Sequence, residues 1–283
     1  MQIKIAKLRI KILLLILVRY GVAIAQDDVE IDKVNYIASY LYTFQEDSLS
    51  NDRLKSEEMN LYIGSTYSKF EHAYAYQRDS IIKVYKNHTN QQEATQIAWS
   101  LIQQLPGGGH FTKFKILKEN NNDTITFFES NITSKVNLKV IQNIQIDWNL
   151  VESNDTIICN YKCHKATCNF SGRYYKAWYT MELPFNNGPY KFLGLPGLIV
   201  KIEDKEGQHI FELTSFNKIN YCMPIYFNKE RYKTTDMRAY YRAKKTRAME
   251  LVQLINNSQT FGDVNTGEIE AKIMTLNNYI ERL

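Results

Sequence analysis

Between residues 111 and 215 the chain is a succession of short β-branched and aromatic segments, each separated from the next by a polar turn. Short polar connections are typical of antiparallel neighbours, because parallel strands need crossover connections of a dozen or more residues. We therefore predict an α+β fold, mainly antiparallel β: a curved meander sheet or open half-barrel with helical insertions and a C-terminal helix. The predicted strands of this region are 111–118, 123–130, 135–141, 144–150, 157–169, 173–182, 198–203 and 208–215, with turns that include 119–122, 152–155 and 170–172.

Upstream of this region the sequence predicts two strands followed by a helical insertion. Residues 34–44 are rich in aromatic and β-branched side chains and predict a long strand, with 58–65 as its antiparallel partner. Residues 67–85 have weak helical spacing, and 87–104 have apolar residues at i, i+3, i+4, i+7 and i+8 before a proline. We therefore expect a helical insertion at about 67–104, lying beside the sheet.

The last segment, about 234–283, is predicted to be helical. Thr234, Thr235 and Asp236 are candidate N-caps for a helix over 237–255. The basic residues of this helix are Arg238, Arg242, Lys244, Lys245 and Arg247. A basic helix face can make peripheral contact with anionic head groups of a membrane. It can also be a solvated face that acidic residues elsewhere balance.

Residues 1–25 predict a secretory signal peptide. Four basic residues precede an apolar run at 12–18, and Ala23-Ile24-Ala25 provides an A-x-A cleavage site before Gln26. The apolar run is much shorter than the ~20 residues that a membrane-spanning helix needs. We therefore expect an exported protein, periplasmic or associated with the outer envelope, whose mature chain, 26–283, forms a single β-rich domain.

The charge of the mature chain argues against a nucleic-acid partner. The formal net charge of the whole chain is +5, and residues 1–25 contain five lysine and arginine residues and no acid, so the mature chain has a formal charge of zero. Phosphate binding needs a basic surface. The apparent basicity therefore belongs to the export signal, and we expect no nucleic acid among the partners.

The densest local pattern lies at residues 188–202, GPYKFLGLPGLIVKI. Leu198 begins an apolar, β-branched run of the kind found in buried strands, and Gly194, Pro196 and Gly197 before it predict a tight structural turn. If Gly197 needs a positive φ, replacing it by valine should lower the free energy of unfolding by ~1–3 kcal/mol.

This stretch carries a resemblance to a known family. The string GLPGLI, the GPYKF before it, and Gly172, Arg173, Trp178 and Glu182 further upstream resemble the GLPGLI family, over about 155–215. The resemblance implies an exported protein of Bacteroidota without an established biochemical activity. The candidate binding residues of this motif region are Arg173, Trp178, Tyr190, Phe192, Leu195 and Leu198.

Four cysteines, Cys159, Cys163, Cys168 and Cys222, could form disulfides in an exported protein. In one strand over 157–169 the first three would be too far apart to bridge, at about 3.3 Å per residue, so a disulfide would involve Cys222. Cys163, His164 and Cys168 have the right chemistry for a metal site. Alternation places Cys163 on one face and the other two on the opposite face, however, and we expect no metal.

The sequence lacks the common catalytic and cofactor-binding motifs, including G-x-S-x-G, H-E-x-x-H, C-x-x-C and G-x-G-x-x-G after a strand. We therefore assign no catalytic residue and no cofactor. An active site assembled from distant residues stays open as an alternative, and the sequence leaves the question of an enzyme unsettled, with the balance against one.

Three functions compete for this chain. The favoured one is a non-enzymatic binding or carrier protein for an apolar ligand, a peptide or an envelope partner, because 13% of its residues are aromatic and large rings line apolar pockets well. The second is an envelope hydrolase, or an enzyme-associated factor, using Arg173, Glu182, Glu203 or Asp204. The third is a structural interaction module, which should present a flat exposed strand at a sheet edge and no enclosed cavity.

Overall fold

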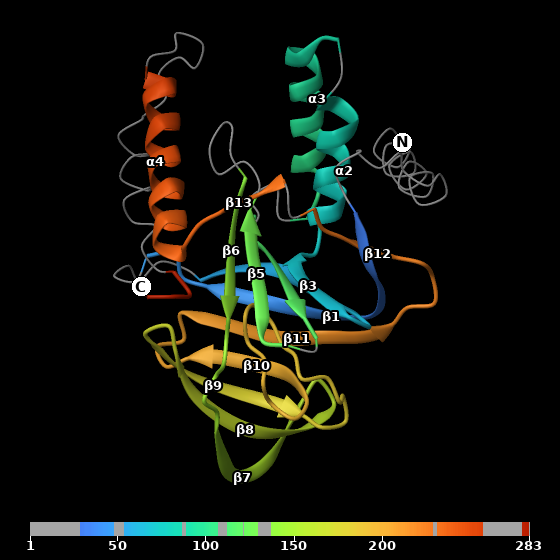
Figure 1. The fold of residues 1–283 in the computed structure, drawn as a ribbon, viewed down its shortest axis with the longest axis vertical. Coiled ribbons are helices and arrows are strands. Elements are labelled where there is room, and N and C mark those ends of the chain that lie inside the picture. Colours follow the sequence, from blue (N-terminus) through green and yellow to red (C-terminus); the bar gives the residue numbers. More distant parts are fainter. Residues whose placement is uncertain are drawn as a thin grey trace, which may run out of the picture.

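The computed structural model describes residues 29–47, 54–86, 89–106, 112–120, 122–129, 137–228, 231–256 and 279–282 (Figure 1). The predicted signal peptide lies outside these residues. The strands are β1 (Glu30–Phe44), β2 (Lys55–Gly64), β3 (Tyr67–His72), β4 (Lys115–Glu119), β5 (Thr124–Glu129), β6 (Leu138–Asn143), β7 (Asn149–Ile158), β8 (Tyr161–Phe170), β9 (Arg173–Thr180), β10 (Leu198–Asp204), β11 (His209–Lys218), β12 (Pro224–Tyr226) and β13 (Lys233–Thr234). The helices are α2 (Ala75–Lys86), α3 (Gln91–Gln103) and α4 (Met237–Asn256).

These strands form one open, mostly antiparallel sheet that consists of two meanders. Strands β1 to β6 are neighbours in chain order, and so are β7 to β11, and the pairing of β1 with β11 joins the two sets. Strand β12 pairs with β1, and β13 pairs with β6 in parallel. The predicted fold class, a mainly antiparallel curved sheet with helical additions, is therefore confirmed.

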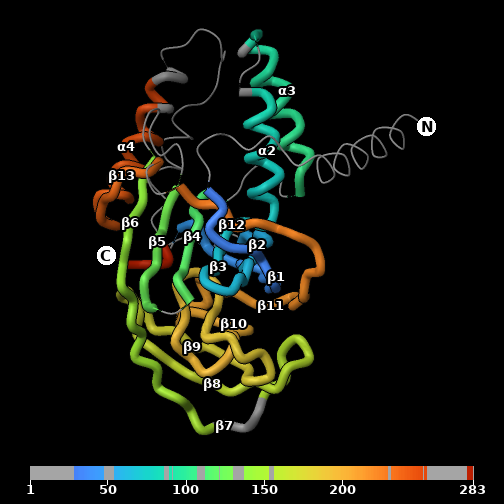
Figure 2. The backbone as a smooth tube through the Cα atoms, turned by 45° about the vertical axis from the view of Figure 1, so that its right-hand side comes forward, coloured from blue at the N-terminus to red at the C-terminus, as the bar shows by residue number. Residues whose placement is uncertain are grey.

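The connection from β6 to β7 requires strong curvature of this sheet. In the strand order β6 lies next to one end and β7 is the other end, yet only residues 144–148 connect them. Five residues span at most about 20 Å at 3.3–3.6 Å each, so the two ends of the sheet must curl toward one another. In both Figure 1 and Figure 2 the chain continues from the lower end of β6 down to β7.

Two tight turns join the strands that end this sheet. Cys159 and Asn160 connect β7 to β8, with φ of 50° and 66°, and Ser171 and Gly172 connect β8 to β9, with φ of 45° and 76°. Positive φ at both central residues is the requirement of the two-residue turns whose twist matches antiparallel strands. The turn predicted at 170–172 is thus present. The turn expected at 152–155 is wrong, because β7 continues through it with a register shift between Val151 and Thr156.

The helical insertion is shorter than its spacing suggested. Tyr67–His72, expected as helix, is strand β3, which pairs with both β2 and β4. Its buried positions include Ser68 and His72, and these polar residues conceal the alternation of a strand. In α3 the side chain of Asn90 accepts a hydrogen bond from the backbone N–H of Glu93 and caps the helix.

Helix α4 confirms the helix predicted over 237–255. The Oδ1 atom of Asp236 accepts a hydrogen bond from the backbone N–H of Ala239 at 2.8 Å, so Asp236 is the N-cap. Arg238, Arg242 and Lys245 are exposed. None of the helices in the described part of the chain combines the length and the apolar character needed to cross a bilayer.

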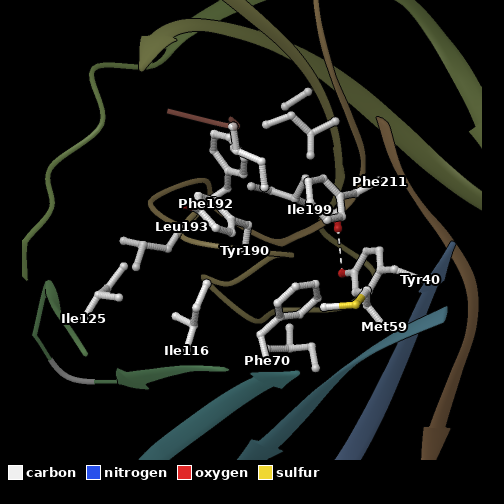
Figure 3. Close-up of a cluster of buried hydrophobic side chains, with 14 of the residues drawn as sticks. Tyr40, Met59, Phe70, Ile116, Ile125, Tyr190, Phe192, Leu193, Ile199 and Phe211 are labelled. Carbon is white, nitrogen blue, oxygen red and sulfur yellow. Dashed lines mark hydrogen bonds between the residues drawn. The ribbon is translucent and has the colours of Figure 1, made fainter. Parts of the chain in front are cut away.

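The interior of the curved sheet is filled by the chain itself. Residues 181–197, between β9 and β10, follow an irregular path into the concave side (Figure 2). Figure 3 shows Tyr190, Phe192 and Leu193 from this segment facing Phe70 and Ile116 of the opposite strands. We call residues 183–197 the motif loop.

Candidate functional site

The motif loop is held inside the sheet by a buried lysine. Lys118 of β4 donates to Oδ1 of Asn187 (2.9 Å) and to the carbonyl oxygens of Gly188 (2.6 Å) and Phe192 (3.1 Å). Asn187 in turn donates to Oγ of Ser68 on β3 at 2.7 Å. Buried backbone carbonyls need partners, and Lys118 supplies them to an irregular segment that has no ladder of its own. Burial lowers the pKa of Lys118 well below its usual value.

Close backbone contacts explain the glycines of the motif loop. A Cβ on Gly197 would lie 2.1 Å from the carbonyl oxygen of Thr180 at the end of β9. Gly197 does not have a positive φ, so the reason expected from the sequence is wrong and close approach replaces it. Gly194 does have a positive φ, 101°, and Nε1 of Trp148 donates to the adjacent carbonyl of Leu193 at 2.8 Å.

The inner side of β9 and the motif loop together form a site that we call the cradle. The cradle consists of Ser171, Gly172, Arg173, Tyr175, Tyr190 and Lys191. It holds Tyr279–Ile280–Glu281–Arg282, which we call the C-terminal segment. In both Figure 1 and Figure 2 this segment, in red, lies between the foot of α4 and the sheet.

Most of the hydrogen bonds in the cradle go to the main chain of the C-terminal segment. Nε and Nη2 of Arg173 donate to the carbonyl oxygen of Tyr279 at 3.1 and 2.9 Å. The hydroxyl of Tyr175 donates to the carbonyl of Ile280 at 2.9 Å. The backbone N–H of Arg282 donates to the carbonyl of Ser171 at 2.8 Å. Contacts of this kind depend on the path of the backbone, which bends at Ile280 and Glu281, rather than on side-chain identity.

One side chain of the segment is bound by charge. The carboxylate of Glu281, a residue only 2% exposed, forms an ion pair with Lys191 and accepts a hydrogen bond from the hydroxyl of Tyr190 at 2.5 Å. The side chain of Lys191 is fully buried and also donates to Oε1 of Gln142 at 2.5 Å. Burial lowers the pKa of Lys191, and the nearby Glu281 carboxylate opposes that shift. Burial and Glu281 both raise the pKa of Tyr190.

The walls of the cradle are fixed by contacts that do not involve the C-terminal segment. Arg173 forms a buried ion pair with Asp204 (2.7 Å) and donates to Gln208 (3.1 Å). The rings of Tyr175 and Tyr190 pack against Phe192 with centroid distances of 4.8 and 6.1 Å. Gly172 leaves room for the C-terminal segment because it has no side chain: a Cβ there would lie 2.8 Å from the carbonyl oxygen of Arg282.

The predicted binding residues divide into three groups. Arg173 and Tyr190 belong to the cradle. Phe192, Leu195 and Leu198 are buried in the core beneath it, with at most 1% exposure. Trp178 lies apart from them on the other face of β9, where Lys165 and Lys201 approach its ring at 5.7 and 5.6 Å.

The structure does not bring the carboxylates of the hydrolase alternative together. Asp204 is buried against Arg173, whereas Glu203, the next residue of β10, lies 3.7 Å from Lys201 in a partly exposed pair. The exposed Glu182 accepts a hydrogen bond from the backbone N–H of Lys162 at 2.8 Å. Two opposed carboxylates in one pocket, the signature that this alternative needs, are therefore not formed by these residues.

The cysteines are free thiols in this structure. Cys163 and Cys168 are buried, Cys159 lies in the turn before β8, and Cys222 is exposed, so the possible disulfide with Cys222 is not formed. Cys168 pairs with Tyr175 and His164 with Tyr179, which places both on the inner face of β8, away from Cys163. Burial raises the pKa of Cys168 to about 12. Within the described residues, no group of His, Cys, Asp and Glu side chains could hold a metal ion.

A small cavity lies between β12, β3 and α2. Its volume is about 30 Å³, and its lining includes Lys69, Glu71 and Ile225. Ligand pockets typically have volumes of roughly 300–1,000 Å³. This cavity has room for water but not for an apolar ligand.

The binding residues predicted from the sequence include two of the six cradle residues, Arg173 and Tyr190, and they do not include Glu281, which the cradle binds. Lys191 stands inside an otherwise apolar run, and a lysine in such a context is a signal that it meets a buried acceptor. No comparable signal marks Glu281, which lies 90 residues further along the chain, in a segment expected only to be polar and helical. Alternation marks Tyr175 as one of several aromatic residues of β9, but it does not indicate a donor.

The comparison with solved structures concerns the class of fold. Two structures of PNGF-II, in space groups C2 and P21, match with TM-scores of 0.50 and 0.48 and 15% sequence identity. They cover 76% of this chain, which spans about a third of theirs, 33% and 34%. A structure of MucB in complex with MucA(peri) has a TM-score of 0.27 and 10% identity, covering 67% of this chain and 51% of that one. At 15% identity the likeness to the PNGF-II structure in space group C2 concerns the fold alone.

The family comparison concerns the cradle more directly. Residues 171–201 match a family described as a protein of unknown function (Porph_ging). This matched stretch contains every residue of the cradle and the whole motif loop. No curated protein matches the chain.

Proposed function

We propose that this is an exported, non-enzymatic binding protein whose ligand is a segment of polypeptide, and that the cradle is its binding site. Of the ligands considered from the sequence, an apolar molecule, a peptide or an envelope partner, the proposal selects a peptide. Export to the periplasm or outer envelope is part of the proposal and rests on residues 1–25.

The observation that carries the proposal is the contact with main-chain carbonyls. Arg173 and Tyr175 each donate to a backbone oxygen of the C-terminal segment. Recognition of backbone groups, with a few pockets for side chains, is how peptide-binding sites hold extended ligands. The cradle therefore has the chemistry of a peptide site.

The filled interior argues against an apolar carrier. A carrier of this architecture would hold its ligand on the concave side of the sheet, but Tyr190, Phe192 and Leu195 of the motif loop occupy that space with at most 1% exposure. Displacing the loop would leave Lys118 without its three acceptors, and an unpaired buried charge is costly.

Native mass spectrometry of residues 26–283, purified from the protein's own envelope, tests this proposal. We expect the mass of the chain alone or of the chain with a polypeptide. A lipid or other apolar molecule bound at one copy per chain would overturn it.

A pull-down with matched variants tests whether a polypeptide binds to the chain through the cradle. A polypeptide recovered with the wild-type chain should be recovered less with Tyr175→Phe, which removes the hydroxyl that meets the ligand backbone. Tyr174→Phe changes the neighbouring residue, which is on the outer face of β9 and 37% exposed, and should have no effect.

A further inference from the structure

The C-terminal segment has the properties of a bound ligand rather than of a structural element. It is four residues long in the described chain, forms no strand or helix, and is separated from α4 by residues 257–278. Its main-chain groups meet the cradle, and only Ile280 and Glu281 are buried among its side chains, at 5% and 2% exposure.

The cradle, in contrast, is organised without it. Asp204 and Gln208 orient Arg173, Gln142 contacts Lys191, and Phe192 packs against both tyrosines. A site whose donors are held in place before binding loses less conformational entropy when it binds. Removing the segment would therefore leave a formed site that presents two cationic side chains and two hydroxyls.

The arrangement selects a particular kind of peptide. Ile280 fills an apolar position, and Glu281 meets Lys191 and Tyr190 in a place that admits little water. Breaking a buried ion pair by removing one partner is far more costly than losing an exposed pair. Arg282 lies above Gly172, where its backbone passes too close for a Cβ. The preferred ligand is thus a short peptide that bends in the cradle, as Ile280 and Glu281 do, and that carries an apolar residue followed by an acidic one.

We propose that the cradle is an exchangeable binding site for short peptides with an apolar–acidic pair, and that the protein's own C-terminal segment occupies it as a built-in competitor. This inference rests on the proposed function, and adds to it the class of ligand and its regulation. A competitor that belongs to the same chain binds intramolecularly, with an effective concentration that can reach the order of millimolar. A partner peptide must therefore bind well enough to displace the segment, which would limit capture to strong ligands.

The test uses the full chain and cuts it after folding. A protease recognition sequence inserted between Gly262 and Asp263 allows the piece that carries the C-terminal segment to be released from its covalent attachment. Native mass spectrometry then follows the replacement of this piece by an excess of the same peptide, residues 263–283, labelled with heavy isotopes. We expect the cut piece to stay bound and the heavy peptide to replace it.

Variants of the peptide and of the protein define the site. A heavy peptide with Glu281→Gln should bind about tenfold more weakly or worse, because the buried Lys191 then loses its charged partner. A peptide with Asn277→Gln, outside the C-terminal segment, is the matched control. In the protein, Tyr175→Phe should weaken the wild-type peptide about fivefold, as expected for one lost hydrogen bond, and Tyr174→Phe should not.

Three results would overturn the inference. One is a folded, cut protein that loses its peptide and does not take up the heavy copy at about 100-fold excess, which by mass action should favour replacement. Another is a Glu281→Gln peptide that exchanges as well as the wild type. The third is retention without exchange, or unfolding once the peptide leaves, which would make the segment part of the fold. Failure of the proposed function would be a different result, namely an apolar ligand bound to the intact chain.

Discussion

At Gly197 the requirement for glycine comes from a close neighbour and not from the dihedral angles of the residue itself. The carbonyl of Thr180 occupies the space where a Cβ would be, 2.1 Å away, and that carbonyl belongs to the backbone at the end of β9. A side chain can rotate away from such a contact, but a strand cannot. The motif loop thus depends on glycine at this position in order to pack under β9.

We expect Gly197→Ala to lower the free energy of unfolding by at least about 2 kcal/mol, because the backbone must shift to relieve the contact. The urea concentration at the unfolding midpoint measures this change. Gly207→Asn is the control. Gly207 has a φ of 67°, and a Cβ added there would meet nothing within 4 Å. Asparagine tolerates that conformation, so the cost should stay below about 1 kcal/mol. Equal midpoints for Gly197→Ala and wild type would show that the close contact is not rigid.

Also at the residue scale, local sequence patterns predicted the features that depend on residues close together in the chain. Alternation located β9, with Arg173 and Tyr175 on one face, and the Ser171–Gly172 turn followed from turn chemistry. The ion pair between Lys191 and Glu281 could not be predicted, because no periodic pattern links residues 90 positions apart. The sequence could therefore indicate part of the cradle, which lies in the β8–β9 turn, on β9 and in the motif loop, but not the C-terminal segment that the cradle holds.

At the scale of elements, polar residues at buried positions hide a strand from its sequence pattern. In β3 the inward side chains include Ser68 and His72, which are satisfied by Asn187 and by the backbone N–H of Tyr74. Hydrophobicity alternates only when buried residues are apolar, and here the hydrogen bonds of distant elements allow polar ones. The strand could be recognised only once its neighbours β2 and β4 were known.

Strand β7 presents a different property of elements, an edge. It ends the strand order of the described sheet, and Leu150, Val151 and Ile157 are 62%, 37% and 76% exposed. This is the exposed edge that the interaction-module alternative anticipates, although the register shift after Val151 interrupts its regularity. Bulges and charges are the usual protection of such edges, and Ile157 lies beyond the bulge.

We expect Ile157→Lys to reduce concentration-dependent self-association, because a lysine on an edge disfavours pairing with another strand. Light scattering over a range of protein concentrations measures this. The melting temperature should stay within about 2 °C of wild type, since the side chain is exposed. Ile202→Lys, at a position with no exposure in β10, is the matched contrast and should unfold the protein. A wild-type chain that is monomeric at every concentration would show that the bulge alone protects the edge.

At the scale of the whole molecule, the two meanders depend on one another, and the C-terminal segment packs between them. The β1–β11 pairing joins the meanders, the motif loop fills the space between them, and residues 279–282 pack where the loop meets β9. Residues near the two ends of the described chain thus contribute to one sheet and its core. A chain with such non-local contacts is expected to fold slowly. Its apolar strands are therefore exposed for longer before the sheet forms.

Export is the whole-molecule property that the sequence predicts most specifically. If residues 1–25 are removed after Ala25, the mature chain starts at Gln26 and its formal charge falls from +5 to zero. Intact-mass measurement of the protein recovered from the envelope fraction should give the mass of residues 26–283. Ala25→Arg places a large charged residue at the cleavage position, where small residues are required, and should leave the precursor uncut. Ala6→Arg adds the same charge within the basic n-region and serves as the control, because it should still be cleaved. Recovery of the wild-type chain with residues 1–25 attached would contradict the prediction and would return five positive charges to the protein, which would reopen the question of an anionic partner.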